Sequence, residues 1–122
     1  MNVLIDSQKR IWVAPYNGGL NCLTHDGKLL ATYTTHNSSL SNNVVLSLAE
    51  REGEIWIGTD GGGINSFDQK TNTFHHYPTT YGEKVTSITD FSENELLLSC
   101  FNKGSLPLIR EPHRCNLFPL SM

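Results

Sequence analysis

The sequence lacks any long hydrophobic run. It has 122 residues, of which 38% are hydrophobic, but no apolar stretch approaches the roughly 18 residues that a membrane-spanning helix needs. Its beginning, MNVLIDSQKRIWV, also lacks the basic start, the long apolar middle and the small-residue cleavage site of a signal peptide. We therefore expect no membrane span in this chain, and we interpret it as either a cytosolic protein or a piece of a longer exported one.

Clusters of basic residues are also missing. Nine Lys and Arg residues stand against 12 Asp and Glu residues, which gives a formal net charge of −3 at pH 7. Apart from the neighbours Lys9 and Arg10, the basic residues are scattered singly. Proteins that bind nucleic acid need a clustered basic surface, so we expect no nucleic-acid partner.

Cysteines are few, and neither they nor the adjacent histidines have a spacing that suits metal binding. Cys22, Cys100 and Cys115 do not form a C-x-x-C pair, so their spacing indicates neither a zinc site nor a redox pair. We interpret them as free, partly buried thiols, with a single disulfide as the alternative. The adjacent His75 and His76 would point to opposite faces of an outer strand and could not bind one ion together. We expect neither a metal nor a cofactor.

What the sequence does contain is a repeat with a period of 44 residues. The stretch SQKRIWVAPYNGGLN (residues 7–21) aligns without gaps with REGEIWIGTDGGGIN (residues 51–65). A third unit is weaker: ELLLS at residues 95–99 takes the place of EIWIG, but the tryptophan and most of the glycines are lost. After it, three prolines make regular strands in the tail less expected; they are Pro107, Pro112 and Pro119.

Each unit holds short apolar segments separated by turn residues. Four strands of about four to six residues, recurring every 40 to 45 residues or so, are typical of a propeller blade. No segment carries apolar residues at helical spacing over three turns. We predict an all-β chain, a partial β-propeller of nearly three four-stranded antiparallel blades, in which the blade-like units span residues 1–43, 44–84 and 85–122.

The glycine run at residues 61–63 is interpreted as a turn. A phosphate-binding loop needs its glycines between a strand and a helix, and the segment INSFD that follows favours another strand. The glycines would supply positive φ and let an adjacent blade approach closely. Trp12 and Trp56 occupy equivalent positions and are predicted to lie in the core between blades. Glu50, Glu52 and Glu54 are interpreted as a solvated row of charges rather than an acid/base pair.

The middle unit resembles the repeat of the two-component regulator propeller family. The stretch SLAEREGEIWIGTDGGGINSFD (residues 47–68) is similar to that repeat over its whole length, and HNSSLSNNVV (residues 36–45) resembles the family's link between blades. The first unit departs from the pattern at Ala14 and Pro15. The resemblance implies the periplasmic sensor region of a Bacteroidetes hybrid histidine kinase. Such a region recognises oligosaccharides from polysaccharide breakdown, has no catalysis of its own, and signals through a membrane helix to a kinase outside this chain.

Propellers bind ligands at loops that gather around the central channel, and this rule gives the candidate contacts. An aromatic ring that stacks on a sugar, beside amides and a carboxylate that bond its hydroxyls, would be suitable chemistry. The alternative is that these are ordinary polar turn residues. The candidates are Tyr16, Asn17, Asp60, Phe101, Asn102 and Lys103.

Two other functions stay open. A propeller lyase or hydrolase would need titratable residues repeated near the inner strands, where apolar residues such as Val3, Ile5, Val45 and Ile88 dominate instead. A protein-interaction scaffold is the other alternative. Closed propellers have about four to eight blades, so we also expect this segment to contact neighbouring blades or to self-associate.

Overall fold

The structure is a computed structural model of the chain. Its described backbone covers residues 1–77, 84–92, 95–100, 104–111 and 114–117, and its described side chains cover residues 1–77, 84–89 and 96–100.

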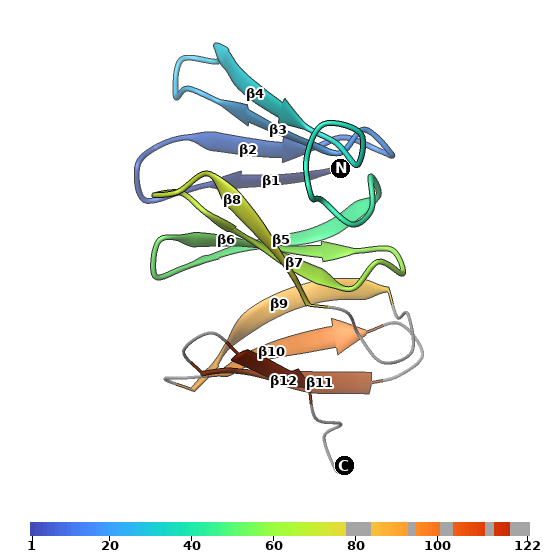
Figure 1. The fold of residues 1–122 in the computed structure, drawn as a ribbon. Coiled ribbons are helices and arrows are strands. Elements are labelled where there is room, and N and C mark those ends of the chain that lie inside the picture. The colour runs from blue at the N-terminus through green and yellow to red at the C-terminus, as the bar shows by residue number, and fades with distance from the viewer. Residues whose placement is uncertain (78–83, 93–94, 101–103, 112–113, 118–122) are drawn as a thin grey trace.

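Three four-stranded antiparallel sheets lie one above another (Figure 1). The first has the order β1 (Asn2–Ile5), β2 (Ile11–Ala14), β3 (Leu20–Leu23), β4 (Leu29–Tyr33). The second has the order β5 (Val45–Arg51), β6 (Glu54–Thr59), β7 (Ile64–Asp68), β8 (Thr73–Tyr77). The third has the order β9 (Val85–Ser92), β10 (Glu95–Cys100), β11 (Gly104–Glu111), β12 (Arg114–Leu117). The predicted fold class, an all-β partial propeller, is confirmed.

The sheets approach one another most closely along their first strands. β5 contacts β1 on one side and β9 on the other. Asn2 Nδ2 donates a hydrogen bond to the carbonyl of Leu46 (2.6 Å), and Ser47 Oγ donates one to the carbonyl of Val85 (2.9 Å). This is the arrangement expected of blades that converge on a central axis.

The hairpin between β1 and β2 is held by a buried carboxylate. Asp6 Oδ1 accepts hydrogen bonds from the backbone N–H groups of Gln8 and Arg10, and its Oδ2 accepts one from Trp12 Nε1, each at 2.9 Å. The Arg10 Nε lies 3.3 Å from Asp6 Oδ2, and Lys9 takes a positive φ of 63°. Asp6 can therefore be 4% exposed because its charge is compensated.

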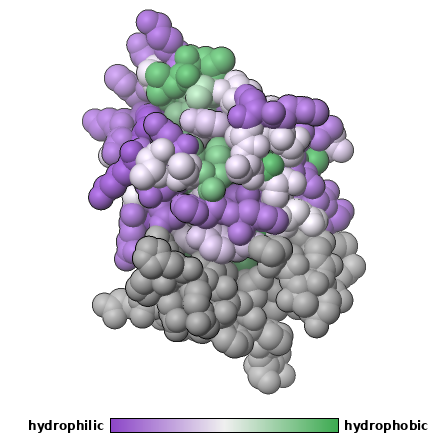
Figure 2. Space-filling view, viewed as in Figure 1, coloured by the Kyte–Doolittle hydropathy of each residue, from purple (hydrophilic) through white to green (hydrophobic). Residues whose placement is uncertain are grey.

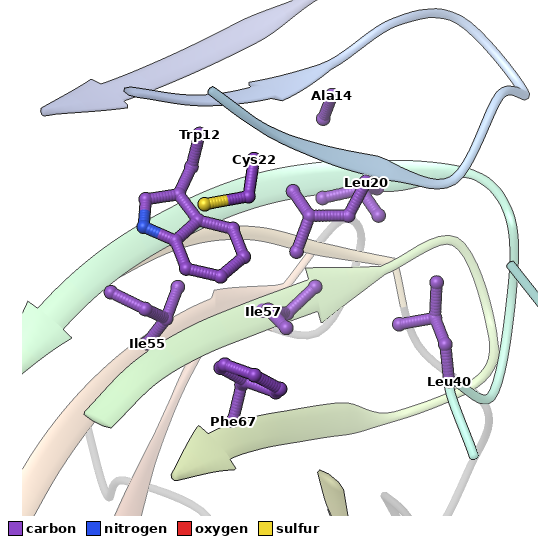
Figure 3. Packing of buried hydrophobic residues seen from close by; sticks show 9 residues of the cluster. Trp12, Ala14, Leu20, Cys22, Leu40, Ile55, Ile57 and Phe67 are labelled. Atoms are coloured by element: carbon purple, nitrogen blue, oxygen red, sulfur yellow. The ribbon is translucent and has the colours of Figure 1, made fainter. Parts of the chain in front are cut away.

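Both tryptophans lie in the core between sheets, as predicted. Trp12 is 1% exposed and packs in the cluster between the first and second sheets, where its ring meets Phe67 at a centroid distance of 5.4 Å. Figure 3 shows Trp12 and Leu20 opposite Ile55 and Phe67. Trp56 is 0% exposed and belongs to a second cluster with residues of the third sheet.

The glycine run is a turn between β6 and β7, as predicted, with φ of 89° at Gly61 and 81° at Gly63. The close approach of a neighbouring sheet occurs at Gly58, inside β6. A Cβ at Gly58 would lie 2.8 Å from the Val85 carbonyl oxygen and would overlap the hydroxyl of Ser47. The missing side chain therefore lets β9 pack against β6.

The expectation about prolines in the tail is wrong for β11, which contains Pro107 opposite Leu97 of β10. Among the described residues, the pairing of β11 with β12 runs from Leu108 to Glu111, so the paired partner of Pro107 there is β10. A strand tolerates proline where its missing N–H is not needed for a second ladder. Pro112 and Pro119 lie outside the described residues.

The interpretation of the three glutamates as a solvated row is also wrong. Glu52 and Gly53 form the two-residue turn between β5 and β6, with φ of 51° and 79°, so the alternation of faces stops there. Glu54 is 6% exposed. The Glu50 carboxylate accepts hydrogen bonds from the backbone N–H (2.9 and 3.1 Å) and the hydroxyl (2.7 Å) of Ser7 in the first sheet.

The prediction of a free thiol is confirmed for Cys22. Cys22 is free and buried, and burial raises its pKa. Cys100 is also buried, and the side chain of Cys115 lies outside the described residues. In the described part of the chain, no helix has the length and apolarity to cross a membrane.

Candidate binding site

Two turns that contain predicted contact residues lie at the same end of the stacked sheets. The β2–β3 turn covers residues 15–19, and the β6–β7 turn covers residues 60–63. Backbone N–H groups of both donate to consecutive carbonyls: Gly19 to Asn43 (2.9 Å) and Asp60 to Val44 (3.0 Å). The segment that joins the first two sheets therefore fixes the two turns relative to each other.

That connecting segment is itself anchored on the β6–β7 turn. Ser41 Oγ donates to the carbonyl of Gly62 (2.7 Å), and Asn42 Nδ2 donates to the carbonyl of Asp60 (3.0 Å). Asn65 Nδ2 donates to Ser41 Oγ (2.8 Å), and Leu40 is buried in the core at 3% exposure. A Cβ on Gly62 would lie 2.8 Å from Asn42 Cβ, so this glycine is required for the close approach of the connection. The sequence SLSNN thus supplies one apolar anchor followed by polar groups that hold the turn.

Three of the six predicted contact residues can be placed. Tyr16 is 89% exposed and lies with Asn17 in the β2–β3 turn. Asn17 is also exposed and takes a positive φ of 52°, a conformation that asparagine tolerates better than most residues. Asp60 lies partly buried at the start of the β6–β7 turn. Phe101, Asn102 and Lys103 lie outside the described residues.

Asp60 has a cationic neighbour that sequence reasoning missed. Lys84 forms a single antiparallel bridge with Asp60, and its Nζ lies 3.8 Å from Asp60 Oδ1. The two residues are 24 positions apart and meet only because Lys84 leads into the first strand of the third sheet. The repeat was the signal that could have found this pair. Asn43 lies just before the second sheet, as Lys84 lies 41 positions later just before the third, and Asn43 also contacts a turn of the preceding sheet.

The histidine pair has a structural contact at this end of the molecule. His75 and His76 are both exposed on β8, the outermost strand of the second sheet, which agrees with their predicted position. His76 Nε2 lies 2.7 Å from the carbonyl oxygen of Gly62. Among the described residues, no group of three His, Cys, Asp or Glu side chains could hold a metal ion.

Comparison with known proteins confirms the family resemblance for the middle of the chain. Residues 39–61 match the model of the two component regulator propeller family. These residues contain the second half of the connection, all of β5 and β6, and the start of the β6–β7 turn. No curated protein matches the sequence.

Solved structures share the fold at low sequence identity. The extracellular domain of the putative hybrid two component system BT3049 from B. thetaiotaomicron has a TM-score of 0.74 and 22% identity, covering 96% of this chain and 16% of that one. Streptogramin B lyase has a TM-score of 0.71 and 18% identity, covering 98% of this chain and 40% of that one. The computationally designed protein Ika8 has a TM-score of 0.63 and 15% identity, and the match covers 88% of this chain and 32% of that one. This chain therefore spans well under half the length of each.

Proposed function

Since the chain carries a repeat of the two-component regulator propeller family, we propose that it forms part of the periplasmic sensor of a hybrid two-component histidine kinase. The family match at residues 39–61 supports this assignment, and the shared fold with an extracellular domain of that class agrees with it. The kinase and the membrane anchor would belong to parts of the protein outside this sequence. The segment itself would bind and not catalyse.

The ligand in this proposal is an oligosaccharide released from a polysaccharide. The observation that carries it is the joint fixation of the two turns, which sets an exposed aromatic ring, Tyr16, on the same end of the molecule as the Asp60 carboxylate. An aromatic face can stack on the apolar face of a sugar ring, while Asn17 and Asp60 can bond its hydroxyls. Turns that are fixed before binding lose less entropy when a ligand binds.

Signalling requires that the ligand prefers one arrangement of the sheets. A ligand with equal affinity for two arrangements shifts neither population. The contacts of Gly19 with Asn43 and of Asp60 with Lys84 both cross from one sheet to the next. A sugar that bridges these turns would therefore favour the arrangement in which the contacts are closed.

The test is to titrate the chain with a panel of defined neutral and acidic oligosaccharides and to measure the dissociation constants by calorimetry. Tyr16→Ala and Asp60→Asn should each weaken binding about tenfold, as expected for the loss of one stacking or hydrogen-bonding contact. His25→Ala is the matched control, because His25 is exposed in the β3–β4 turn at the opposite end of the first sheet. Glycan turnover instead of simple binding would refute the assignment as a binding segment, and specific capture of a protein partner without any sugar binding would favour a scaffold.

We also propose that a further sheet of the same repeat covers the outer face of the first sheet. Figure 2 shows hydrophobic residues gathered at the top of the view, over this sheet. Cross-strand pairs place Val3, Ile5 and Leu29 on that face, where they are 58%, 66% and 59% exposed. The pair Ile11–Leu23 on the same face aligns with Ile55–Phe67, which Trp12 covers in the second sheet.

In the isolated chain this open face should cause self-association. Light scattering at increasing concentration should show species larger than a monomer, and the double variant Val3→Lys, Ile5→Lys should reduce them, because charged side chains resist burial. A chain that stays monomeric at high concentration would show that the face needs no partner.

A further inference from the structure

A groove lies between the outer strands of the first two sheets, and its lining contains none of the residues of the two turns discussed above. Its volume is about 320 Å³. It lies where the end of β4 and the connection after it meet the β7–β8 turn and the start of β8. Its lining residues are Tyr33, Asn37, Ser38, Ser39, Asn72, Thr73 and Phe74.

Two aromatic rings form the apolar part of the groove. Tyr33 and Phe74 are partly buried, and their ring centroids lie 5.2 Å apart in an edge-to-face arrangement. One buried ring supports both: the centroid of the Phe67 ring lies 5.2 Å from that of Tyr33 and 4.9 Å from that of Phe74. Because the core fixes these rings, their exposed surfaces are available to a ligand without further loss of side-chain entropy.

The polar residues at the rim of the groove differ in whether their side chains can bind a ligand. The Asn37 amide is occupied, since its Oδ1 accepts from the Thr34 N–H (2.7 Å) and its Nδ2 donates to the Thr32 carbonyl (2.8 Å). Within the described part of the chain, the side chains of Ser39 and Asn72 make no hydrogen bond, and both residues are exposed.

The backbone at Asn72 is held in place even though its side chain is available. Its N–H donates to the Asp68 carbonyl (2.8 Å), and its φ is 55°. The groove thus offers a side-chain amide on a held backbone, and a hydroxyl from Ser39, beside an aromatic surface.

The lining also sets the charge of a suitable ligand. None of the seven lining residues is Lys, Arg, Asp or Glu, so nothing in the groove would compensate a carboxylate or a phosphate that loses water there. The volume lies at the small end of the range for small-molecule sites, roughly 300–1,000 Å³. A small, neutral, polyhydroxylated ligand with one apolar face fits these constraints.

We propose that this groove is a second saccharide subsite, which takes one or two rings of a neutral sugar. The sugar stacks on Tyr33 and Phe74, and its hydroxyls bond the Ser39 hydroxyl and the Asn72 amide. The inference rests on the proposed sugar-sensing function. It adds a sugar contact at the outer strands to the one proposed at the β2–β3 and β6–β7 turns.

The test compares two sets of variants in the full chain. The probes are cellobiose, maltose and xylobiose, with digalacturonic acid as the charged comparison, and the readout is the dissociation constant together with NMR shifts of backbone amides. Asn72→Gly removes the amide and keeps the positive φ, since glycine adopts it freely, and Ser39→Ala removes the hydroxyl. The double variant should weaken binding of a neutral probe about tenfold without lowering the melting temperature, and the amides of residues 37–39 and 72–74 should shift on binding in the unaltered chain.

The outcomes separate this inference from the proposed function. If Tyr16→Ala and Asp60→Asn weaken binding while the double groove variant binds like the unaltered chain, the subsite is refuted and the turn site stands. Preference for digalacturonic acid at the groove would also refute the subsite. If none of the neutral disaccharides binds the unaltered chain at millimolar concentration, the subsite is refuted, whereas the sugar-sensing proposal fails only when the whole oligosaccharide panel also fails to bind.

Discussion

The first and second sheets have nearly the same apolar pattern but differ in how much of it is buried. Every residue of β6 in the second sheet is buried, whereas buried and partly exposed residues alternate along β2. The second sheet has a neighbour on each face, and the first has one on a single face. Burial in this fold therefore depends on the position of a sheet in the stack as much as on its own residues.

Aligned polar residues also differ between the two sheets. Asp6 and Glu50 are 44 positions apart. Asp6 closes its own hairpin and accepts from Trp12, whereas Glu50, one methylene longer, reaches Ser7 in the first sheet. The same repeat position can thus stabilise a hairpin in one unit and an inter-sheet contact in the next.

The largest effect is expected from the tryptophans, which test whether the two inter-sheet clusters are equivalent. Trp56→Ala should lower the free energy of unfolding by about 3–5 kcal/mol, because it empties a fully buried site between the second and third sheets. Trp12→Ala should fall in the same range. Urea denaturation of both variants measures this, and a near-neutral result for Trp56→Ala would mean that the third sheet does not cover it in solution.

A matched isoleucine pair separates sheet position from residue type. Ile55 is 0% exposed, whereas the aligned Ile11 lies on the open face of the first sheet. Ile55→Ala should cost about 2–5 kcal/mol, and Ile11→Ala should cost below about 1 kcal/mol when the chain is dilute and monomeric. Urea denaturation in dilute solution measures both variants. An equal loss of unfolding free energy in the two would contradict the difference in burial between the two faces.

The repeat position that holds Gly58 in the second sheet holds Ala14 in the first. The next pair of variants exchanges these two residue types. Gly58→Ala should destabilise by about 1–3 kcal/mol, because the added methyl would meet Ser47 and Val85. The reverse change, Ala14→Gly, should cost only about 0.5–1 kcal/mol. Thermal unfolding of the two variants compares them, and tolerance of Gly58→Ala would indicate that β9 can move away from β6.

The repeat predicted the fold well because a blade is specified locally. The apolar pattern around Trp12 and Trp56, the glycine turn and the absence of helical spacing each follow from short stretches of sequence. Contacts between sheets were harder to predict: the bond of Glu50 to Ser7 and the pairing of Asp60 with Lys84 depend on how far one sheet is displaced from the next. The groove on the outer strands was missed for the same reason, since Tyr33 and Phe74 come from different units.

The smallest effect concerns the ion pair between the second and third sheets. At the corresponding place between the first and second sheets, the backbone carbonyl of Asn43 accepts from Gly19 without any ion pair. The side chains of Lys84 and Asp60 are 53% and 35% exposed and 3.8 Å apart, so solvent and salt screen their attraction. Asp60→Asn should therefore change the free energy of unfolding by less than about 1 kcal/mol, and the difference should shrink further as salt is added. The backbone hydrogen bonds of Asp60 to Val44 and Asn42 are kept in this variant. A larger loss that persists at high salt would therefore show that the contact of the Asp60 carboxylate with Lys84 orders the junction of the two sheets, and the weaker sugar binding expected of this variant would then reflect a displaced turn as well as a missing carboxylate.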